Sequence, residues 1–464
     1  MPRIQRQVVD VEFQGSEAAA LELQQRVVGL CRGSLATALA AALARHDSDE
    51  RWTVVERIEV DLGRVPLQEL ERAWLCELPR AVAQALEERE PSAQAERAPG
   101  APAAPRALER TRLAPQQALP SAVAYFLEHG RLPWWFTLPP GRSLGQACSE
   151  FLASPELRSR SSGADLARAL RASAPARARL TRQFEPETAL GLLAQAEPER
   201  HALWLACAER LHAGNPPPSL RAGLERALLS VVLELPELPP RAPSALDAGL
   251  QSVLERAAQE LEPRERARHA GPSAAEAADR PRVPGRALSL SAADDFEVAR
   301  AGLAVANAGL VLLHPFLPRF LELLDVAREG VLLRPARAAL LLHHLACGAR
   351  SAEEHELVLA KLLCGLPLES VLEREDALSE AEAAEARALL EAVLRHWEAL
   401  RSTTVDGLRG NFLARAGRLE PAQAEWVLHV EAQSFDFLLE GLPWGIAHLK
   451  LPWMTRLLRV EWPR

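Results

Sequence analysis

Residues 307–325 read NAGLVLLHPFLPRFLELLD and contain two prolines, Pro315 and Pro318. Both prolines fall in the first turn of a helix that is predicted to run to about Asp325. Proline is tolerated there because the first backbone N–H groups of a helix have no partner within it. The two prolines therefore indicate a helix start, and the sequence on either side carries further signals of this kind.

Further helix starts and stops follow in the same part of the chain. Ser351 with Glu354, and Ser379 with Glu382, have the spacing of a capping box, in which a hydroxyl and a carboxylate satisfy free N–H groups of the first turn. Glycines then stop two of the helices. The predicted helices run from Pro335 to about Gly348, from Ser351 to Gly365, and from Ser379 to about Leu400.

The C-terminal tail changes to the period of a β-strand. Residues 426–430 place apolar side chains at every second position, which is typical of a half-buried strand. Residues 446–451 and 457–462 read as two further strands. Residues 291–464, the C-terminal region, are therefore predicted to be helical and to end in short strands.

The first 90 residues read as strand, helix, strand, helix. Apolar residues alternate with polar ones over residues 9–13 and again over residues 54–62, which predicts two half-buried strands. Ser16 is expected to cap the first helix. Pro66 fits the first turn of the second helix, which Pro79 is expected to split.

Composition divides the rest of the chain. Residues 91–118 and 263–290 have too few large apolar residues to offset the entropy of ordering, so both are predicted to be linkers. Between them lies a helical middle region, residues 119–262, with helical runs around 164–182, 187–212 and 219–234. The expected fold is mainly α with smaller α+β parts: an α+β unit at residues 1–90, the middle region, and the C-terminal region.

Composition and charge argue against several classes of function. The net charge of −8 argues against nucleic acid as the main partner, because phosphate binding needs clustered positive charge. No run of 18 or more apolar residues appears, and the start lacks the apolar core of a signal peptide, so we expect a cytoplasmic protein without a membrane partner. The six cysteines are scattered without a C-x-x-C pair, which indicates neither a zinc site nor disulfides.

No catalytic constellation emerges from the residues. His343 and His344 are adjacent, so on a helix they diverge by about 100° and cannot both face one metal ion. His355 precedes a glutamate but lacks the second histidine of H-E-x-x-H. The nucleophile elbow, the Walker phosphate loop and G-x-G-x-x-G are all absent. We therefore expect neither an enzyme activity nor a metal or cofactor.

Tryptophans beside prolines or near the chain end are candidates for partner contacts, because aromatic residues are enriched at interfaces. The alternative is that each fills a small core between short elements. The final strand is the strongest candidate, because a terminal strand is easily added to the edge of a partner's sheet. The candidate partner-binding residues are Trp134, Trp135, Trp444, Trp453, Val460 and Trp462.

Several longer phrases point to one family. The chain resembles the tape measure proteins of contractile injection systems, phage-tail-like particles in which a sheath drives a rigid tube through a target membrane. The phrases that carry the resemblance are NAGL at 307–310 with HPFL at 314–317, EHEL at 354–357 with KLLCG at 361–365, LPWGI at 442–446 with KLPWM at 450–454, RIEVDLG at 57–63, and YFLEHGRLPWW at 125–135.

The resemblance implies a structural or assembly protein that occupies or guides the growing inner tube and sets the length of tube and sheath before capping. The implied partners are the inner tube protein and the spike or baseplate hub, with the cap protein and a cluster-encoded ATPase as further candidates. The implied location is the cytoplasm during assembly and the interior of the tube afterwards. No residue-level site is implied.

A ruler has to be extended, which constrains this chain. One continuous helix would reach about 700 Å and an extended chain roughly 1,500 Å, whereas a compact fold has a radius of gyration of about 23 Å. The 35 prolines exclude one continuous helix. A ruler therefore requires the chain to be stretched inside the tube, in one or several copies. We expect the C-terminal region to anchor it and residues 91–290 to span.

Two alternatives stay open at this point. The first is an assembly chaperone or scaffold that binds tube or baseplate subunits and then leaves. The second is a hydrolase or toxin cargo, which would require an active site that the known motifs do not reveal.

Overall fold

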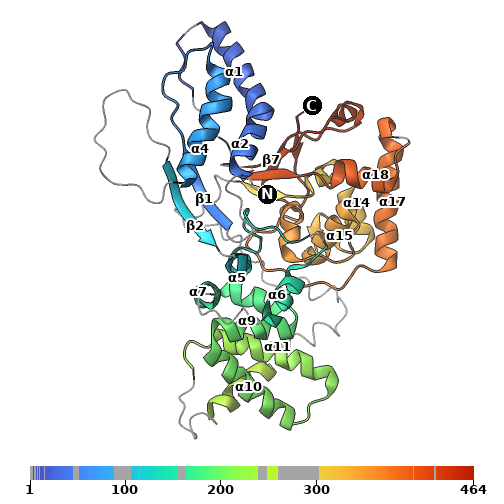
Figure 1. Ribbon diagram of the computed structural model, residues 1–464. Coiled ribbons are helices and arrows are strands. Elements are labelled where there is room, and N and C mark those ends of the chain that lie inside the picture. Colours follow the sequence, from blue (N-terminus) through green and yellow to red (C-terminus); the bar gives the residue numbers. More distant parts are fainter. Residues whose placement is uncertain are drawn as a thin grey trace. The chain divides into compact units, whose positions relative to one another are not determined.

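The computed structural model of the 464-residue chain describes residues 4, 7, 9, 11–14, 16–44, 52–87, 106–113, 115–139, 141–154, 162–238, 248–259, 302–400, 402–422 and 425–463. These residues are mainly helical with short strands, which confirms the expected fold class (Figure 1). The chain divides into two compact units, Met1–Leu119 and Pro120–Arg464. The second unit contains nearly all of the middle region and the whole C-terminal region.

The first unit consists of short helices and a two-stranded sheet. Ser16 caps the first helix as expected, because its hydroxyl accepts a hydrogen bond from the backbone N–H of Ala19. Leu23, Leu35 and Trp74 are buried in the small core that the helices enclose. The elements are α1 (Glu17–Arg32), α2 (Ser34–Ala44), β1 (Trp52–Glu59), α3 (Leu70–Arg72), η1 (Ala73–Glu77), α4 (Leu78–Glu87) and β2 (Arg106–Leu113).

Three expectations for this unit need correction. Residues 9 and 11–13, the described part of the strand predicted over 9–13, lie outside regular secondary structure. The strand predicted over 54–62 is present as β1, but its antiparallel partner β2 lies inside the predicted linker 91–118. The composition of β2 gives no sign of a strand, because pairing with a distant strand outweighs local propensity. Pro79 does not split its helix, since the π-helical turn η1 precedes it and accommodates the residue without an N–H.

Prolines divide the middle region into short helices. The helical runs predicted around 164–182 and 187–212 are each made of two helices. The second helix of each run carries a proline in its first turn, Pro175 in the first run and Pro198 in the second. Gly130 ends the first helix with a φ of 71°, as its place after an aromatic helix predicts. The elements are α5 (Pro115–His129), α6 (Leu144–Ala153), α7 (Ser162–Ala172), α8 (Ala174–Gln183), α9 (Pro186–Ala196), α10 (Pro198–Ala213), α11 (Pro218–Glu234) and a helix over 248–259.

Most helix signals of the C-terminal region are confirmed. α15 (Pro335–Cys347) begins at Pro335 and ends at the left-handed Gly348. α17 (Glu380–His396) opens with the predicted capping box of Ser379 and Glu382, and α14 (Leu317–Leu323) carries Pro318 in its first turn. Pro315, which was predicted in the same first turn, lies before α14 in the turn at 314–316. The remaining helical elements are η4 (Ala308–Leu313), η5 (Glu354–Leu357), α16 (Val358–Leu363), η6 (Glu398–Leu400), α18 (Val405–Leu408), η7 (Arg409–Leu413) and η8 (Asp436–Gly441).

The capping box predicted for Ser351 and Glu354 is wrong. The box is formed by Glu353 and Glu356, whose carboxylate accepts the backbone N–H of Glu353 at 2.8 Å. Glu354 is instead buried, with 1% of its surface exposed. The local spacing is that of a helix start, but the carboxylate is held by residues that are distant in the sequence.

A five-stranded sheet closes the C-terminal region. Its strands lie in the order β3-β6-β7-β9-β8, and β9 runs parallel to β7. The strands predicted over 426–430 and 457–462 are confirmed as β7 and β9, the one predicted over 446–451 is reduced to the two residues of β8, and β3 and β6 were not predicted. The strands are β3 (Leu303–Val305), β6 (Gly417–Pro421), β7 (Glu425–Val430), β8 (His448–Leu449) and β9 (Leu457–Glu461), with a separate hairpin of β4 (Ala327–Arg328) and β5 (Val331–Leu332).

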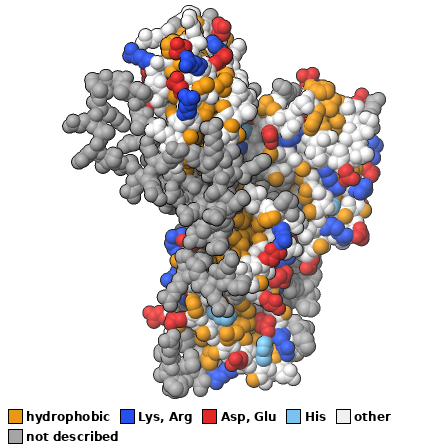
Figure 2. Space-filling model, viewed as in Figure 1, with side chains coloured by type: hydrophobic (Ala, Val, Ile, Leu, Met, Phe, Trp, Pro, Cys, Tyr) orange, Lys and Arg blue, Asp and Glu red, His pale blue; other side chains and the backbone are white. Residues whose placement is uncertain are grey.

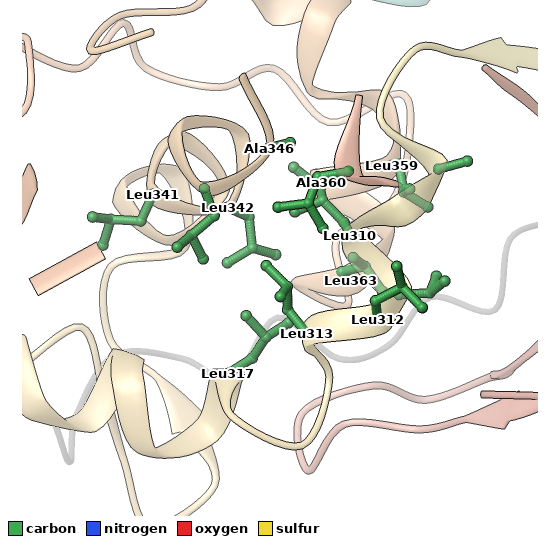
Figure 3. Packing of buried hydrophobic residues seen from close by; sticks show 14 of the residues in the cluster. Leu310, Leu312, Leu313, Leu317, Leu341, Leu342, Ala346, Leu359, Ala360 and Leu363 are labelled. Carbon is green, nitrogen blue, oxygen red and sulfur yellow. The ribbon is translucent and has the colours of Figure 1, made fainter. Parts of the chain in front are cut away.

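One hydrophobic core unites these helices and the sheet. Figure 3 shows leucines of η4, α15 and α16 packed against one another, among them Leu313, Leu342 and Leu363. These side chains are at most 1% exposed. All described members of this core lie between residues 303 and 462, so the C-terminal region completes its own core.

Candidate functional site

The four candidate tryptophans outside the final strand are half-buried. Trp134 and Trp135 follow α5 in the middle region. Trp444 and Trp453 pack against the C-terminal core, and their indole N–H groups donate to backbone carbonyls of that core at 3.0 and 2.8 Å. The structure therefore places two of them in each region. A partner role for these four stays a prediction.

The final strand was expected to be free to join the edge of a partner's sheet, but in the structure it lies inside the chain's own sheet. β9 lies between β7 and β8, and the backbone N–H of Val460 donates to the carbonyl of Ala447. Val460 and Trp462 are both buried. Adding β9 to a partner's sheet would therefore require β8 to be displaced. The last strand in the sequence is an inner strand because β7 pairs with it on one side and β8 on the other.

A buried ion pair holds this end of the chain in place. Asp436 accepts hydrogen bonds from Nη1 and Nη2 of Arg415 at 3.1 and 2.9 Å, and from the indole N–H of Trp462 at 3.0 Å. The backbone N–H of Gln433 adds a fourth at 2.8 Å. The guanidinium also lies over the Trp462 ring, 5.4 Å from its centroid. This cluster is structural, because one carboxylate satisfies four donors and both charges are sealed from water.

A second buried cluster joins the two regions of the larger unit. Glu354 of η5 accepts hydrogen bonds on one oxygen, Oε1, from Arg179 Nε at 3.0 Å and from Lys361 Nζ at 2.6 Å. Arg179 belongs to α8 of the middle region, whereas the other two belong to the C-terminal region. All three are at most 1% exposed. We call Arg179, Glu354 and Lys361 the buried junction.

The end of α5 also belongs to this site. Arg179 Nη1 donates to the carbonyls of Leu127 and Glu128 at 2.9 and 2.8 Å, so the guanidinium caps the last turn of α5. Gly130 packs against the ion pair. A Cβ atom at Gly130 would lie 2.8 Å from Arg179 Nη2, and closer still to the Glu354 carboxylate, so only glycine leaves room for the pair.

Lys361 is the third member of the junction and is fully hydrogen-bonded. Besides Glu354, its ammonium donates to the backbone carbonyls of Leu368 and Ser370 at 3.2 and 2.8 Å. Burial lowers the pKa of Lys361, and the Glu354 carboxylate opposes that shift. The second oxygen of Glu354 is buried without a hydrogen-bond partner among the described protein atoms. Such a sealed arrangement suits fastening of chain segments rather than proton transfer to a substrate.

Polar contacts continue around the buried junction. The carboxylate of Glu353 accepts the backbone N–H groups of Leu144 and Gly145, the first two residues of α6, at 2.6 and 3.0 Å. Gln183 donates to the carbonyl of Leu372 at 2.8 Å. At the rim, Arg374 pairs with Glu185 at 2.8 Å, and Arg182 pairs with Glu373 at 3.4 Å. Each of these contacts crosses from the middle region to the C-terminal region.

Sequence reasoning missed the buried junction, although the sequence contains traces of it. Lys361 is one of two lysines in a chain whose other basic side chains are arginine or histidine. Glu354 and Lys361 open two of the phrases on which the family resemblance rests. Nothing in the sequence pairs either of them with Arg179, which lies 175 positions before Glu354.

Two histidines near the junction, the half-buried His129 and the buried His343, make stability depend on pH. His129 ends α5 and His343 lies in α15; burial lowers the pKa of each from an ordinary 6.5 to about 4. The unfolded chain therefore binds protons between these values while the folded chain does not. Their contribution to stability is complete above pH 6.5 and is lost as the pH falls towards 4.

We expect His343 to lower the free energy of unfolding by about 2 kcal/mol between pH 7.5 and pH 5, and the more exposed His129 to contribute less. The measurement is urea unfolding at both pH values, for the natural chain and for His343→Asn. The variant should lose about 2 kcal/mol less than the natural chain on acidification. Equal pH dependence of the two proteins would show that His343 is not kept neutral by the fold.

The described residues offer little else that points to chemistry. Among them, no three His, Cys, Asp or Glu side chains cluster closely enough to hold a metal ion. No described helix is both long and apolar enough to span a membrane. On the face shown in Figure 2, acidic and basic side chains are interspersed over the described surface. Such mixing is typical of a solvated surface.

Comparison with known proteins gives one match. No curated protein and no solved structure matches the chain. A family model, described as contractile injection system tape measure protein, matches residues 1–462. Since the match covers almost the whole chain, this protein belongs to the family of contractile injection system tape measure proteins.

Proposed function

We propose that this chain sets the length of the inner tube and sheath by occupying or guiding the growing tube. The observation that carries the proposal is the family match over residues 1–462, which supports a structural and length-determining role. The proposed partners are the inner tube protein and the spike or baseplate hub, and further the cap protein and a cluster-encoded ATPase. The proposed location is the cytoplasm during assembly and the tube interior afterwards.

The buried junction bears on how such a ruler would work. Arg179 and Glu354 hold the middle region against the C-terminal region, so in this state α8 cannot be part of a stretched segment. If residues 91–290 are the segment that stretches along the tube, these contacts must be broken first. Residues 263–290 lie outside the described residues, so changing the chain length there leaves the sequence of every described helix intact.

The test is to delete residues 263–290 and measure tube length by electron microscopy. A stretched chain should give tubes shorter by about 90 Å if the segment is extended, or by about 40 Å if it is helical. The control reverses the order of the same residues, which keeps length and composition, and should leave tube length unchanged. Unchanged tubes at normal yield in the deletion would contradict the ruler.

One observation favours a second candidate, a non-resident assembly chaperone or scaffold. The described part of Pro120–Arg464 is folded around buried charges, as expected for a protein that works as a compact body. Such a factor would leave after assembly. Mass spectrometry of finished particles separates the two candidates, because a resident ruler should be present in constant copy number per tube.

A further inference from the structure

The middle and C-terminal regions meet through charged and polar groups and through an edge-on contact of Phe126 with the His355 ring, while each has a core of its own. The C-terminal core is completed by residues 303–462. The middle region buries its own leucines, including Leu170, Leu193 and Leu228. The hydrogen bonds and ion pairs between the regions come from Arg179, Arg182, Gln183, Glu185 and the start of α6 on one side, and from residues 353–374 on the other.

Because the contacts between the regions are polar and the cores are apolar, opening the junction should cost much less free energy than unfolding either core. Separating the regions returns Arg179, Glu354 and Lys361 to water together, so the lost ion pairs are offset by hydration and no buried charge is left unpaired. Unfolding either core would expose its leucines at about 25 cal/mol for each Å² of apolar surface. Interfaces between parts of one chain generally permit relative motion unless they are large and hydrophobic.

We propose that the buried junction is a reversible latch, at which the middle region undocks from the C-terminal region while both stay folded. The covalent connection permits this, because the chain between residues 259 and 302 can span up to ~140 Å. In the closed latch, Glu354 accepts a hydrogen bond from Arg179, and Glu353 accepts hydrogen bonds from the first backbone N–H groups of α6. Undocking would free the middle region for another arrangement in the particle, but the latch itself does not depend on the length-setting role.

The backbone N–H groups of Leu144 and Gly145 report on the state of the latch. Both donate to the Glu353 carboxylate, and as the first residues of α6 they have no acceptor within the helix. They become free to exchange with solvent as soon as the regions separate. Amides inside α10 and α15 exchange only when their own helices open, so they serve as internal references.

The experiment is hydrogen–deuterium exchange of the full chain, followed by mass spectrometry of peptides covering 141–153, α10 and α15. In the natural protein, Leu144 and Gly145 should exchange faster than the α15 core. Arg179→Met leaves Glu354 and Lys361 in place but removes the buried ion pair between the regions. It should speed exchange at Leu144 and Gly145 by ~100-fold or more, with α10 and α15 unchanged. Parallel acceleration of α15 would show one cooperative body and overturn the latch.

A milder pair of variants tests the latch if Arg179→Met does not fold. Arg374 and Glu185 form an exposed ion pair across the rim, with side chains 51% and 69% exposed. Arg374→Glu should speed exchange at Leu144 and Gly145 by about two- to fivefold. Combining it with Glu185→Arg restores opposite charges and should restore slow exchange. A single variant without effect, or a double variant without rescue, would contradict the proposal.

Discussion

Replacing Gly309 with alanine should unfold or severely destabilise the C-terminal region, by about 4 kcal/mol or more. Gly309 lies in η4, and the backbone of η7 passes directly over it. An added Cβ would lie 2.6 Å from the carbonyl carbon of Phe412, 2.7 Å from Cα of Leu413, and closer still to the Phe412 oxygen. Backbone atoms cannot swing aside as a flexible side chain can. Gly309, Phe412 and Leu413 are all buried, so the two backbone segments cannot separate there without opening the C-terminal core.

The matched control is Gly410→Ala in η7 itself. A Cβ at Gly410 would meet no atom within 4 Å, and the residue is exposed. Alanine there should be neutral or stabilising by up to about 1 kcal/mol, because it reduces the entropy of the unfolded chain. The measurement is urea unfolding of the full chain together with hydrogen exchange in α15. A stable Gly309→Ala protein would mean that η4 and η7 do not approach as closely as described.

Replacing Asp436 with alanine should cost about 3–5 kcal/mol of unfolding free energy. The change leaves the guanidinium of Arg415, 4% exposed, buried without its counter-charge. It also removes the acceptor for the indole N–H of Trp462 and the backbone N–H of Gln433. A buried charge without a partner costs far more than the intact pair contributes, which is why the expected loss is large.

The control for Asp436 is an aspartate at the surface. Asp406 pairs with Arg409 at 3.6 Å and its side chain is 86% exposed, so Asp406→Ala should cost less than about 1 kcal/mol. Unfolding midpoints in urea of the two variants give the comparison. The double variant Asp436→Leu with Arg415→Met removes both charges and should recover part of the loss. Equal effects of the two aspartate variants would argue that the Asp436 site is open to water.

Signals in the sequence predicted the structure correctly where the two interacting residues lie within a few positions of each other. The capping box of Ser379 and Glu382 and the left-handed stop at Gly348 were predicted and are present. The strands β7 and β9 were found from their period, because alternation is visible within one strand. By contrast, β2, β3 and β6 were missed, since their pairing partners are remote in sequence and their own residues alternate weakly.

The same distinction applies to the candidate sites. The sequence drew attention to Val460 and Trp462 as an available terminal strand, but the sheet encloses β9 between two others. The sequence also indicated a capping box of Ser351 and Glu354, but Glu354 is buried and pairs with Arg179 of α8. Sequence patterns describe residues that are neighbours in the chain. A charge can be buried only where several polar groups from different segments come together, and the sequence does not show where that happens.

The amino-acid sequence by itself determined the mainly helical class, most helix starts and stops of the C-terminal region, and the family to which the chain belongs. These follow from contacts that span three or four residues, or from phrases that can be compared directly. Only the tertiary structure decided which strands are internal, where Gly309 meets η7, and that Arg179 meets Glu354. Such contacts depend on how separate helices pack, and packing is a property of the whole unit, so no local stretch of residues encodes it.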